Sequence, residues 1–294
     1  MSFFIPIHVP LSDFPSEVLK KMKENANPKM SLKLMQCHKY FQHQEFPYFI
    51  IKSFEYDDDE WNFITLNDEV HLYNGVEGIE KLTTKKLWIT ENIILLDNIV
   101  SRLIPKIVVC DILWLKLYNQ KMTYDEFKFL TASGNVEILE LCNTDITHKN
   151  GDFVDVHTLL GCVPNIFEFF LRNKDSPLIH SDSGKAFYKN NTTNLMRVKL
   201  EKISFLDFEN FKKFMKQNPH ISYSLDISAN NSLSSEEFQV LEDYVEEIIY
   251  SRETYFPPPY ITFLGQHGRQ QKFLEYKISE YKKNLPFAVT CSIL

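Results

Sequence analysis

The sequence has no long block of basic residues and no uninterrupted apolar run of 18 residues. Its 32 Lys and Arg are outnumbered by 39 Asp and Glu, which gives a formal net charge of -7. Proteins that neutralise nucleic-acid phosphates need a basic surface, and a membrane-spanning helix needs roughly 20 apolar residues. We therefore expect no nucleic-acid partner and no transmembrane segment.

Cysteine is sparse, and its spacing favours no disulfide framework and no Cys-x-x-Cys metal site. The five cysteines are odd in number and far apart, and most lie in apolar runs such as residues 107–110. The first residues, MSFFIPIHVPL, also lack the basic segment and the cleavage site of a secretory signal peptide. These features are typical of reduced core thiols, so we expect an intracellular protein, cytoplasmic, nuclear or both. The cysteines are Cys37, Cys110, Cys142, Cys162 and Cys291.

Familiar catalytic motifs are missing as well. The chain has no Gly-x-Ser-x-Gly and no recognisable Cys–His dyad, and Cys37, His38 and His43 are not spaced to meet at one tetrahedral metal. The stretch GQHGRQ (265–270) lacks the lysine and hydroxyl pair of a P-loop, so we predict a surface loop there. We expect no enzyme, no catalytic residue, no metal and no cofactor. An active site whose residues converge only in space would also leave no motif in the sequence.

A strand pattern recurs along the middle of the chain. The segments ILWLKLYNQKMT (112–123) and VEILELCNTDIT (136–147) align without a gap at a shift of 24 residues. Each has apolar residues at alternate positions, which is typical of a strand with one buried face. The aligned pairs are Ile112 with Val136, Leu115 with Leu139, Leu117 with Leu141, Asn119 with Asn143 and Met122 with Ile146. Further copies carry Leu87 and Ile89, Phe169 and Leu171, Val198 and Leu200, Leu225 and Ile227, and Ile261 and Phe263.

Segments with helical spacing lie between most of these strands, at 156–163, 208–215 and 238–248. Two helix starts fit a capping box, in which Thr123 pairs with Glu126 and Ser234 with Glu237. A strand–helix unit of about this length cannot bury its apolar face alone, so neighbouring units must stack into a parallel sheet backed by helices. We therefore expect an α/β fold that resembles an irregular leucine-rich-repeat solenoid over residues 81–294. An ordinary α/β domain with strands of similar composition is the alternative.

The N-terminal stretch 13–41 has the pattern of a small helical module. Ser12 or Asp13 can cap a first helix that has Pro15 in its first turn, and Val18, Leu19 and Met22 form one face. So few residues make a poor core on their own. We therefore expect the module, at residues 10–50, to dock on something, with residues 51–80 as a linker or N-terminal cap.

Two parts of this module resemble the F-box. The family opening L-P-x-E-V-L-x-x-I is similar to FPSEVLKKM (14–22), and its P-x-x-L-x-L-x-x-V-C-K stretch is similar to PKMSLKLMQCHK (28–39). The chain departs from the pattern at Phe14, which replaces the leading leucine, and at Ala26 and Met30. This similarity covers about 30 residues, and together with the degenerate repeats the chain resembles the F-box-like families expanded in nematodes.

The resemblance implies a non-catalytic substrate-recognition adaptor of a Skp-cullin-F-box type ubiquitin ligase, within the ubiquitin-conjugation pathway. A Skp-type adaptor protein would bind the N-terminal module, and an unknown protein substrate would bind the repeats. A repeat scaffold with no ligase role, in which the N-terminal helices only cap the repeats, is the alternative. The residues expected at the adaptor contact are Phe14, Pro15, Val18, Leu19, Leu32, Leu34 and Met35.

The last four residues, Cys291 to Leu294, fit a C-a-a-X box ending in leucine, the form expected for geranylgeranylation. Lys282 and Lys283 add a thin basic patch upstream, and one prenyl chain anchors a protein only weakly. Cys291 is therefore a candidate lipidation site, and a buried final strand at NLPFAVTCSIL is the alternative.

Overall fold

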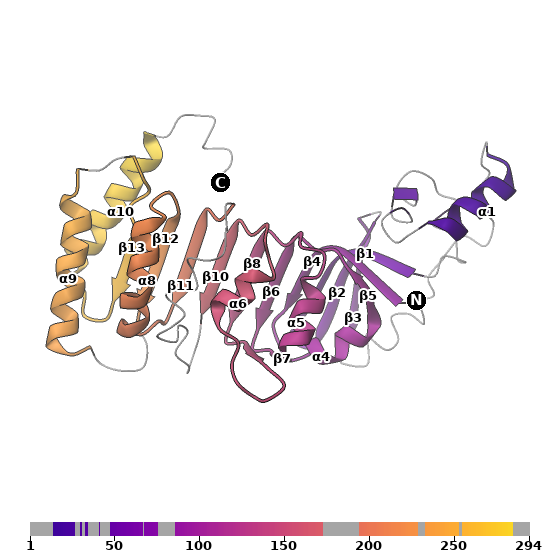
Figure 1. The fold of residues 1–294 in the computed structure, drawn as a ribbon, viewed down its shortest axis with the longest axis horizontal. Coiled ribbons are helices and arrows are strands. Elements are labelled where there is room, and N and C mark those ends of the chain that lie inside the picture. Colours follow the sequence, from indigo (N-terminus) through magenta and orange to yellow (C-terminus); the bar gives the residue numbers. More distant parts are fainter. Residues whose placement is uncertain are drawn as a thin grey trace.

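One large sheet runs along the length of the molecule (Figure 1). A computed structural model of the chain describes residues 14–26, 30, 33–34, 41, 48–66, 68–75, 86–172, 194–228, 233–252 and 255–284. Eleven of the described strands form the sheet, in the order β13-β12-β11-β10-β8-β6-β4-β1-β2-β3, with β5 paired beside β4. The chain therefore has a mixed α/β fold with a mostly parallel sheet.

The strands from β4 onward follow one another across the sheet in chain order. All pairs between β1 and β13 are parallel, and only the pairs of β2 with β1 and with β3 are antiparallel. The strands are β1 (Tyr48–Asp57), β2 (Glu60–Thr65), β3 (Val70–Asn74), β4 (Lys86–Leu95), β5 (Ile107–Cys110), β6 (Trp114–Tyr118), β8 (Ile138–Cys142), β10 (Glu168–Arg172), β11 (Arg197–Glu201), β12 (Ser222–Ile227) and β13 (Tyr260–Phe263). The short β7 (Lys121–Thr123) and β9 (Asp145–Thr147) pair separately.

The register of the parallel strands matches the sequence repeat. Leu115 pairs with Leu139 and Leu117 with Leu141, which is the predicted shift of 24 residues. One predicted copy is corrected: the strand partners of Leu115 and Leu117 are Ile93 and Leu95, not Leu87 and Ile89. β4 is ten residues long. Its first half, with Leu87 and Ile89, pairs with β5, and its second half, with Ile93 and Leu95, pairs with β6 and continues the repeat.

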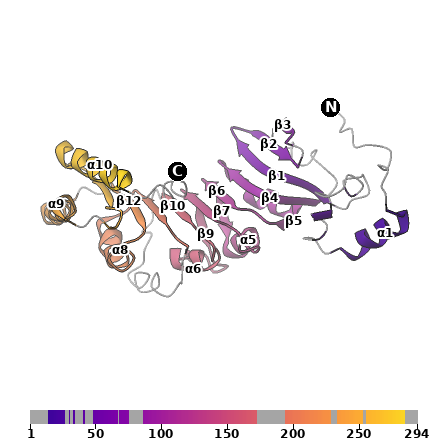
Figure 2. The same ribbon diagram turned by 90° about the horizontal axis from the view of Figure 1, so that it is seen from above.

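Helices cover one face of the sheet, and Figure 2 shows α5, α6 and α8 side by side on that face. Their apolar side chains, among them Phe127, Leu159 and Phe208, form one buried cluster with the leucines of the strands. This arrangement buries the apolar half of every unit against its neighbours. The helices between and after the strands are α4 (Val100–Leu103), the 3-10 turn η2 (Ile104–Lys106), α5 (Tyr124–Leu130), α6 (Val156–Gly161), α8 (Phe205–Gln217), α9 (Ser235–Tyr250) and α10 (Gly268–Lys283).

Both predicted capping boxes are confirmed. The hydroxyl of Thr123 accepts from the backbone N–H of Glu126, and the Glu126 side chain accepts from the Thr123 N–H at the start of α5. Ser234 and Glu237 make the same exchange at α9. A third box, Ser204 with Asp207 at α8, was not anticipated because its acidic residue is the shorter aspartate.

Residues 51–80, expected as a linker or cap, contribute most of β1 together with β2 and β3 to the main sheet. The loop expected at 265–270 is corrected in part, because α10 begins at Gly268 with His267 as its N-cap. The imidazole of His267 lies 3.3 Å from the backbone N–H of Arg269 and accepts its hydrogen bond, which helps to start the helix there.

Candidate functional site

The N-terminal helix α1 (Ser16–Asn25) begins directly after Pro15. The carbonyl oxygen of Pro15 accepts hydrogen bonds from the N–H groups of Val18 at 2.9 Å and Leu19 at 3.2 Å. Pro15 is thus the N-cap and lies one position before the first turn in which it was predicted. Proline is tolerated there because its fixed φ suits the residue before a helix and it has no N–H to satisfy. The expected caps Ser12 and Asp13 lie outside the described residues.

Three exposed apolar residues lie on and just before α1; we call Phe14, Val18 and Met22 the α1 stripe. Their exposed fractions are 58%, 42% and 38%. Phe14 lies two residues before the helix begins, and Val18 and Met22, four apart, lie on one side of it. Pro15, beside the stripe, is exposed as well. Large apolar side chains gathered at the surface of a short helix are typical of a protein-binding site.

Another side of α1 anchors the helix to the rest of the chain. Leu19 is only 3% exposed and lies in a buried cluster with Leu34, Phe41, Ile50 and Trp88. Ile50 and Trp88 are register partners on β1 and β4, and their neighbours Ile51 and Ile89 point into the helix-covered core. Because side chains alternate along a strand, the cluster lies on the sheet face opposite the helices.

The residues expected at the adaptor contact therefore fall into two groups. Phe14, Pro15 and Val18 are exposed, whereas Leu19 and Leu34 are buried within the chain. Leu32, Met35 and the candidate lipidation site Cys291 lie outside the described residues.

The sheet face opposite the helices carries charged and aromatic side chains; we call it the open face. Lys116, between the buried Leu115 and Leu117, lies 3.6 Å from Glu140 on the next strand. Arg197 and Glu168, also on adjacent strands, form an ion pair at 2.6 Å. One row of register partners crosses the face from β4 to β13, through Ile94, Lys116, Glu140, Phe170, Lys199, Ser224 and Tyr260.

Cations of the open face lie close to aromatic rings. The Lys199 amine is 4.7 Å from the centre of the Phe170 ring, and the Lys116 amine is 5.3 Å from that of Tyr118. Such contacts hold the charged groups in place and set aromatic rings, which are enriched at recognition surfaces, among them. This surface was not predicted from the sequence, although its residues are those that alternate with the repeated leucines.

Tyr118 and Cys142, which are both protonated at neutral pH, lie at the edge of the open face. The hydrogen bond with Cys142 and, to a lesser extent, burial raise the pKa of Tyr118 to about 12. Burial raises the pKa of the Cys142 thiol to about 11, and the bond with Tyr118 only partly offsets that rise. Cys142 is thus a thiol rather than a thiolate at neutral pH, which makes it a poor nucleophile.

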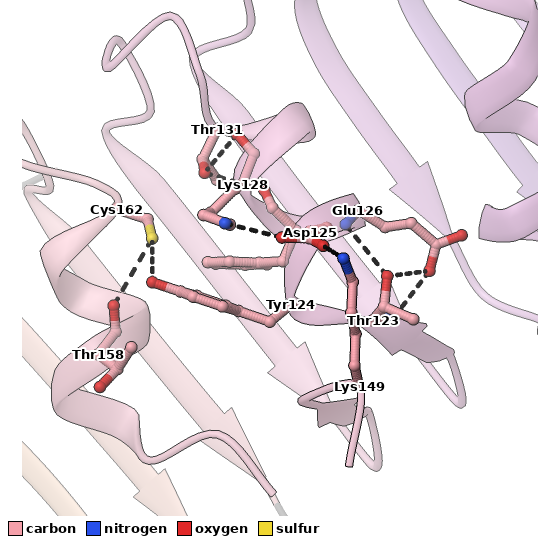
Figure 3. Close-up of polar contacts among 10 residues, drawn as sticks. Thr123, Tyr124, Asp125, Glu126, Lys128, Thr131, Lys149, Thr158 and Cys162 are labelled. Atoms are coloured by element: carbon pink, nitrogen blue, oxygen red, sulfur yellow. Dashed lines mark hydrogen bonds and ion pairs between the residues drawn. The ribbon is translucent and has the colours of Figure 1, made fainter. Parts of the chain in front are cut away.

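A polar cluster joins α5 to α6 on the opposite, helical side of the sheet (Figure 3). The Tyr124 hydroxyl lies 3.5 Å from the Cys162 sulfur, and the Cys162 thiol donates to the Thr158 carbonyl at 3.6 Å. Asp125 pairs with Lys128 at 2.7 Å and with Lys149 at 3.1 Å.

The charges of this cluster are mutually satisfied. The hydrogen bonds from Lys128 and Lys149, and then their positive charges, lower the pKa of Asp125. The hydrogen bond with Cys162 and, to a lesser extent, burial raise the pKa of Tyr124 to about 12. The contacts of Tyr124 with Cys162 and of Asp125 with Lys149 link neighbouring units.

Among the described residues, no three His, Cys, Asp or Glu side chains gather closely enough to hold a metal ion. None of the described helices is both long and apolar enough to cross a membrane. No protein-family model and no curated protein sequence matches this chain.

Proposed function

We propose that the chain is a non-catalytic substrate-recognition adaptor of a Skp-cullin-F-box type ubiquitin ligase. In this role the α1 stripe binds a Skp-type adaptor protein, and the open face of a leucine-rich-repeat-like solenoid holds a protein substrate. The chemistry belongs to the partners, and this chain contributes proximity, because holding the substrate nearby raises the effective concentration of its lysines. The role implies an intracellular location.

The observation that carries the proposal is the α1 stripe. Phe14, Val18 and Met22 expose apolar surface in the segment whose sequence resembles the F-box, and the buried Leu19 fixes the helix from another side. A partner that covered the stripe would remove this surface from water, which favours association by about 25 cal/mol per Å² before the costs of binding.

The repeat region supports the second half of the proposal. Its parallel strands follow chain order, and the side-chain amide of Asn143 lies 3.3 Å from the Asn119 side-chain oxygen. A short asparagine contact of this kind is compatible with a leucine-rich-repeat-like solenoid, in which the face of the sheet opposite α5, α6 and α8 is available to a partner between the parts that α1 and α10 contact.

One observation favours the alternative, a repeat scaffold without a ligase role. Leu19 and Leu34 are buried with Trp88 of β4, so part of the N-terminal module covers the start of the sheet as a cap would. Under this alternative the α1 stripe is not an adaptor contact.

The proposal is tested by binding of the purified full chain to an immobilised Skp-type adaptor from the same organism. Val18→Asp places a charge in the α1 stripe, and we expect it to weaken binding at least tenfold. Leu206→Asp is the matched control, because Leu206 is an exposed apolar residue on α8, 61% accessible. Circular dichroism establishes that both variants are folded.

Binding by the wild type and by Leu206→Asp, with loss in Val18→Asp, supports the ligase role. A folded wild type that does not bind the adaptor contradicts it and favours the scaffold.

A further inference from the structure

The outermost strand of the main sheet is β3, and Figure 2 shows it at the end of the sheet opposite α9 and α10. Among the described residues, β3 pairs only with β2. One side of its backbone therefore faces no described strand; we call this side the β3 edge. An unpaired strand side is a template for the backbone of another chain.

The hydrogen-bond pattern identifies which backbone groups point to the β3 edge. The Thr65 N–H donates to the Glu69 carbonyl at 3.0 Å, and the Gly75 N–H donates to the Asp59 carbonyl at 2.8 Å. Hydrogen-bonded pairs alternate along an antiparallel ladder, so His71 and Tyr73 also direct their backbone groups toward β2. The N–H and C=O groups of Val70, Leu72 and Asn74 consequently point outward.

Two of these residues, Val70 and Leu72, have apolar side chains that are accessible. Val70 is 59% exposed and Leu72 is 65% exposed, and the half-buried Ile64 lies opposite Val70 on β2. Natural proteins usually protect such an edge with lysine, proline or a bulge. β3 contains neither residue, and its pairing with β2 runs without a register shift.

Acidic residues lie at both ends of the β3 edge. Asp58, Asp59 and Glu60 form and follow the turn that lies beside the end of β3. Glu69 precedes its start, and Asp68, one residue earlier, is paired with Lys52. In two antiparallel copies of β3 the start of one strand would lie beside the end of the other, so the two acidic groups would repel each other. Charge complementarity therefore favours a basic partner over a second copy.

We infer that the β3 edge is a docking site for an extended segment of another protein. The segment adds a strand antiparallel to β3, places two apolar side chains two residues apart beside Val70 and Leu72, and carries Lys or Arg on both flanks. Its backbone bonds give affinity, and its apolar and basic side chains give specificity. This contact is separate from the α1 stripe and does not depend on a ligase role.

The probe is a fluorescein-labelled synthetic peptide, Lys-Lys-Thr-Val-Thr-Val-Thr-Lys-Lys, titrated with the full chain and followed by fluorescence anisotropy. We expect Leu72→Lys to weaken binding at least tenfold and Leu206→Lys, equally exposed on α8, to leave it unchanged. N-methylation of both valines should weaken binding to the same extent, because it removes the N–H groups that face Val70 and Leu72.

Amide exchange measured by NMR gives a second readout. On addition of the peptide, the Val70, Leu72 and Asn74 amides should become at least tenfold slower to exchange, while those of His71 and Tyr73 are slow throughout. Equal binding of the N-methylated peptide or of Leu72→Lys would overturn the inference. A dimer of the free chain that Leu72→Lys dissociates would overturn it as well, because the edge would then be covered by a second copy.

Discussion

Asn143 donates its side-chain amide to the side-chain oxygen of Asn119 one unit away, at 3.3 Å, and both residues have left-handed backbones, with φ of 48° and 52°. Each asparagine directly follows its strand, β8 or β6. Lys202 directly follows β11 and has a φ of 56°. The same turn thus recurs along the sheet, and its left-handed position is occupied twice by asparagine and once by lysine, which tolerates it less well.

Replacement of Lys202 by asparagine should stabilise the chain by about 0.5 kcal/mol, because it relieves left-handed strain at an unchanged turn. Asn143→Ala should destabilise the chain by about 1 kcal/mol, because alanine tolerates a left-handed backbone less well than asparagine does. Urea unfolding followed by circular dichroism measures both. Equal stability of wild type, Lys202→Asn and Lys202→Gly would show that no strain is stored at this position.

Gln120 is fully buried and joins two units. Its side-chain oxygen accepts from the N–H groups of Ile99 at 3.0 Å and Val100 at 3.1 Å at the start of α4, and its amide donates to the Tyr118 carbonyl at 2.6 Å. Gln120→Leu should lower the free energy of unfolding by about 3 kcal/mol, since it leaves buried backbone groups unpaired. The exposed Gln239→Leu is the control and should change it by less than about 0.5 kcal/mol.

Lys277 of α10 holds the end of α9. Its amine donates to the carbonyls of Ile248 at 2.5 Å, Ile249 at 3.0 Å and Ser251 at 2.5 Å, and a cation at a helix C-terminus is favourable. Lys277→Met should therefore cost about 1–2 kcal/mol in thermal or urea unfolding. Lys272→Met, on the exposed part of the same helix, should be neutral, and equal losses in both variants would refute the capping role.

The raised pKa of Cys142, about 11 against 9.0 for an unperturbed thiol, predicts a loss of stability in alkali. The unfolded thiol ionises first as the pH rises, so the unfolded state binds fewer protons and stability falls from about pH 9 to 11. The loss reaches on the order of 2 kcal/mol at pH 11. Cys142→Ala should flatten this part of the stability–pH curve, and an unchanged slope would contradict the assignment.

The repeat was predictable because leucines at alternate positions and the following asparagine recur together, as at Leu115 and Leu117 and again at Leu139 and Leu141. Burial of one face fixes such a register, since a slip by one residue would expose the leucines. The capping boxes at Thr123 and Ser234 were predictable because each side chain accepts a hydrogen bond from the backbone N–H of the other residue, three positions away.

The β1–β3 hairpins were not predicted, although Asp58 and Asp59 form the turn between β1 and β2. Both residues have positive φ, 48° and 64°, and aspartate is a weaker signal for such a hairpin than the usual Asn-Gly. Helix α10 was missed because its apolar spacing is sparse and Leu274 is its only residue that the structure describes as buried. Val18 is exposed whereas Leu19 is buried. This difference was not predicted because it depends on packing against Trp88 of β4, which is distant in sequence.

The arrangement of the parallel strands in chain order also determines how the chain unfolds. Among the described residues, β8, β10, β11 and β12 each pair only with the preceding and following strands of the main sheet, so the stability of this region is close to a sum of nearest-neighbour terms. Under mechanical or thermal stress, units at one end can detach while the rest remains folded. A ligand bound to one part of the open face would therefore protect its own units first, and distant units only through those between.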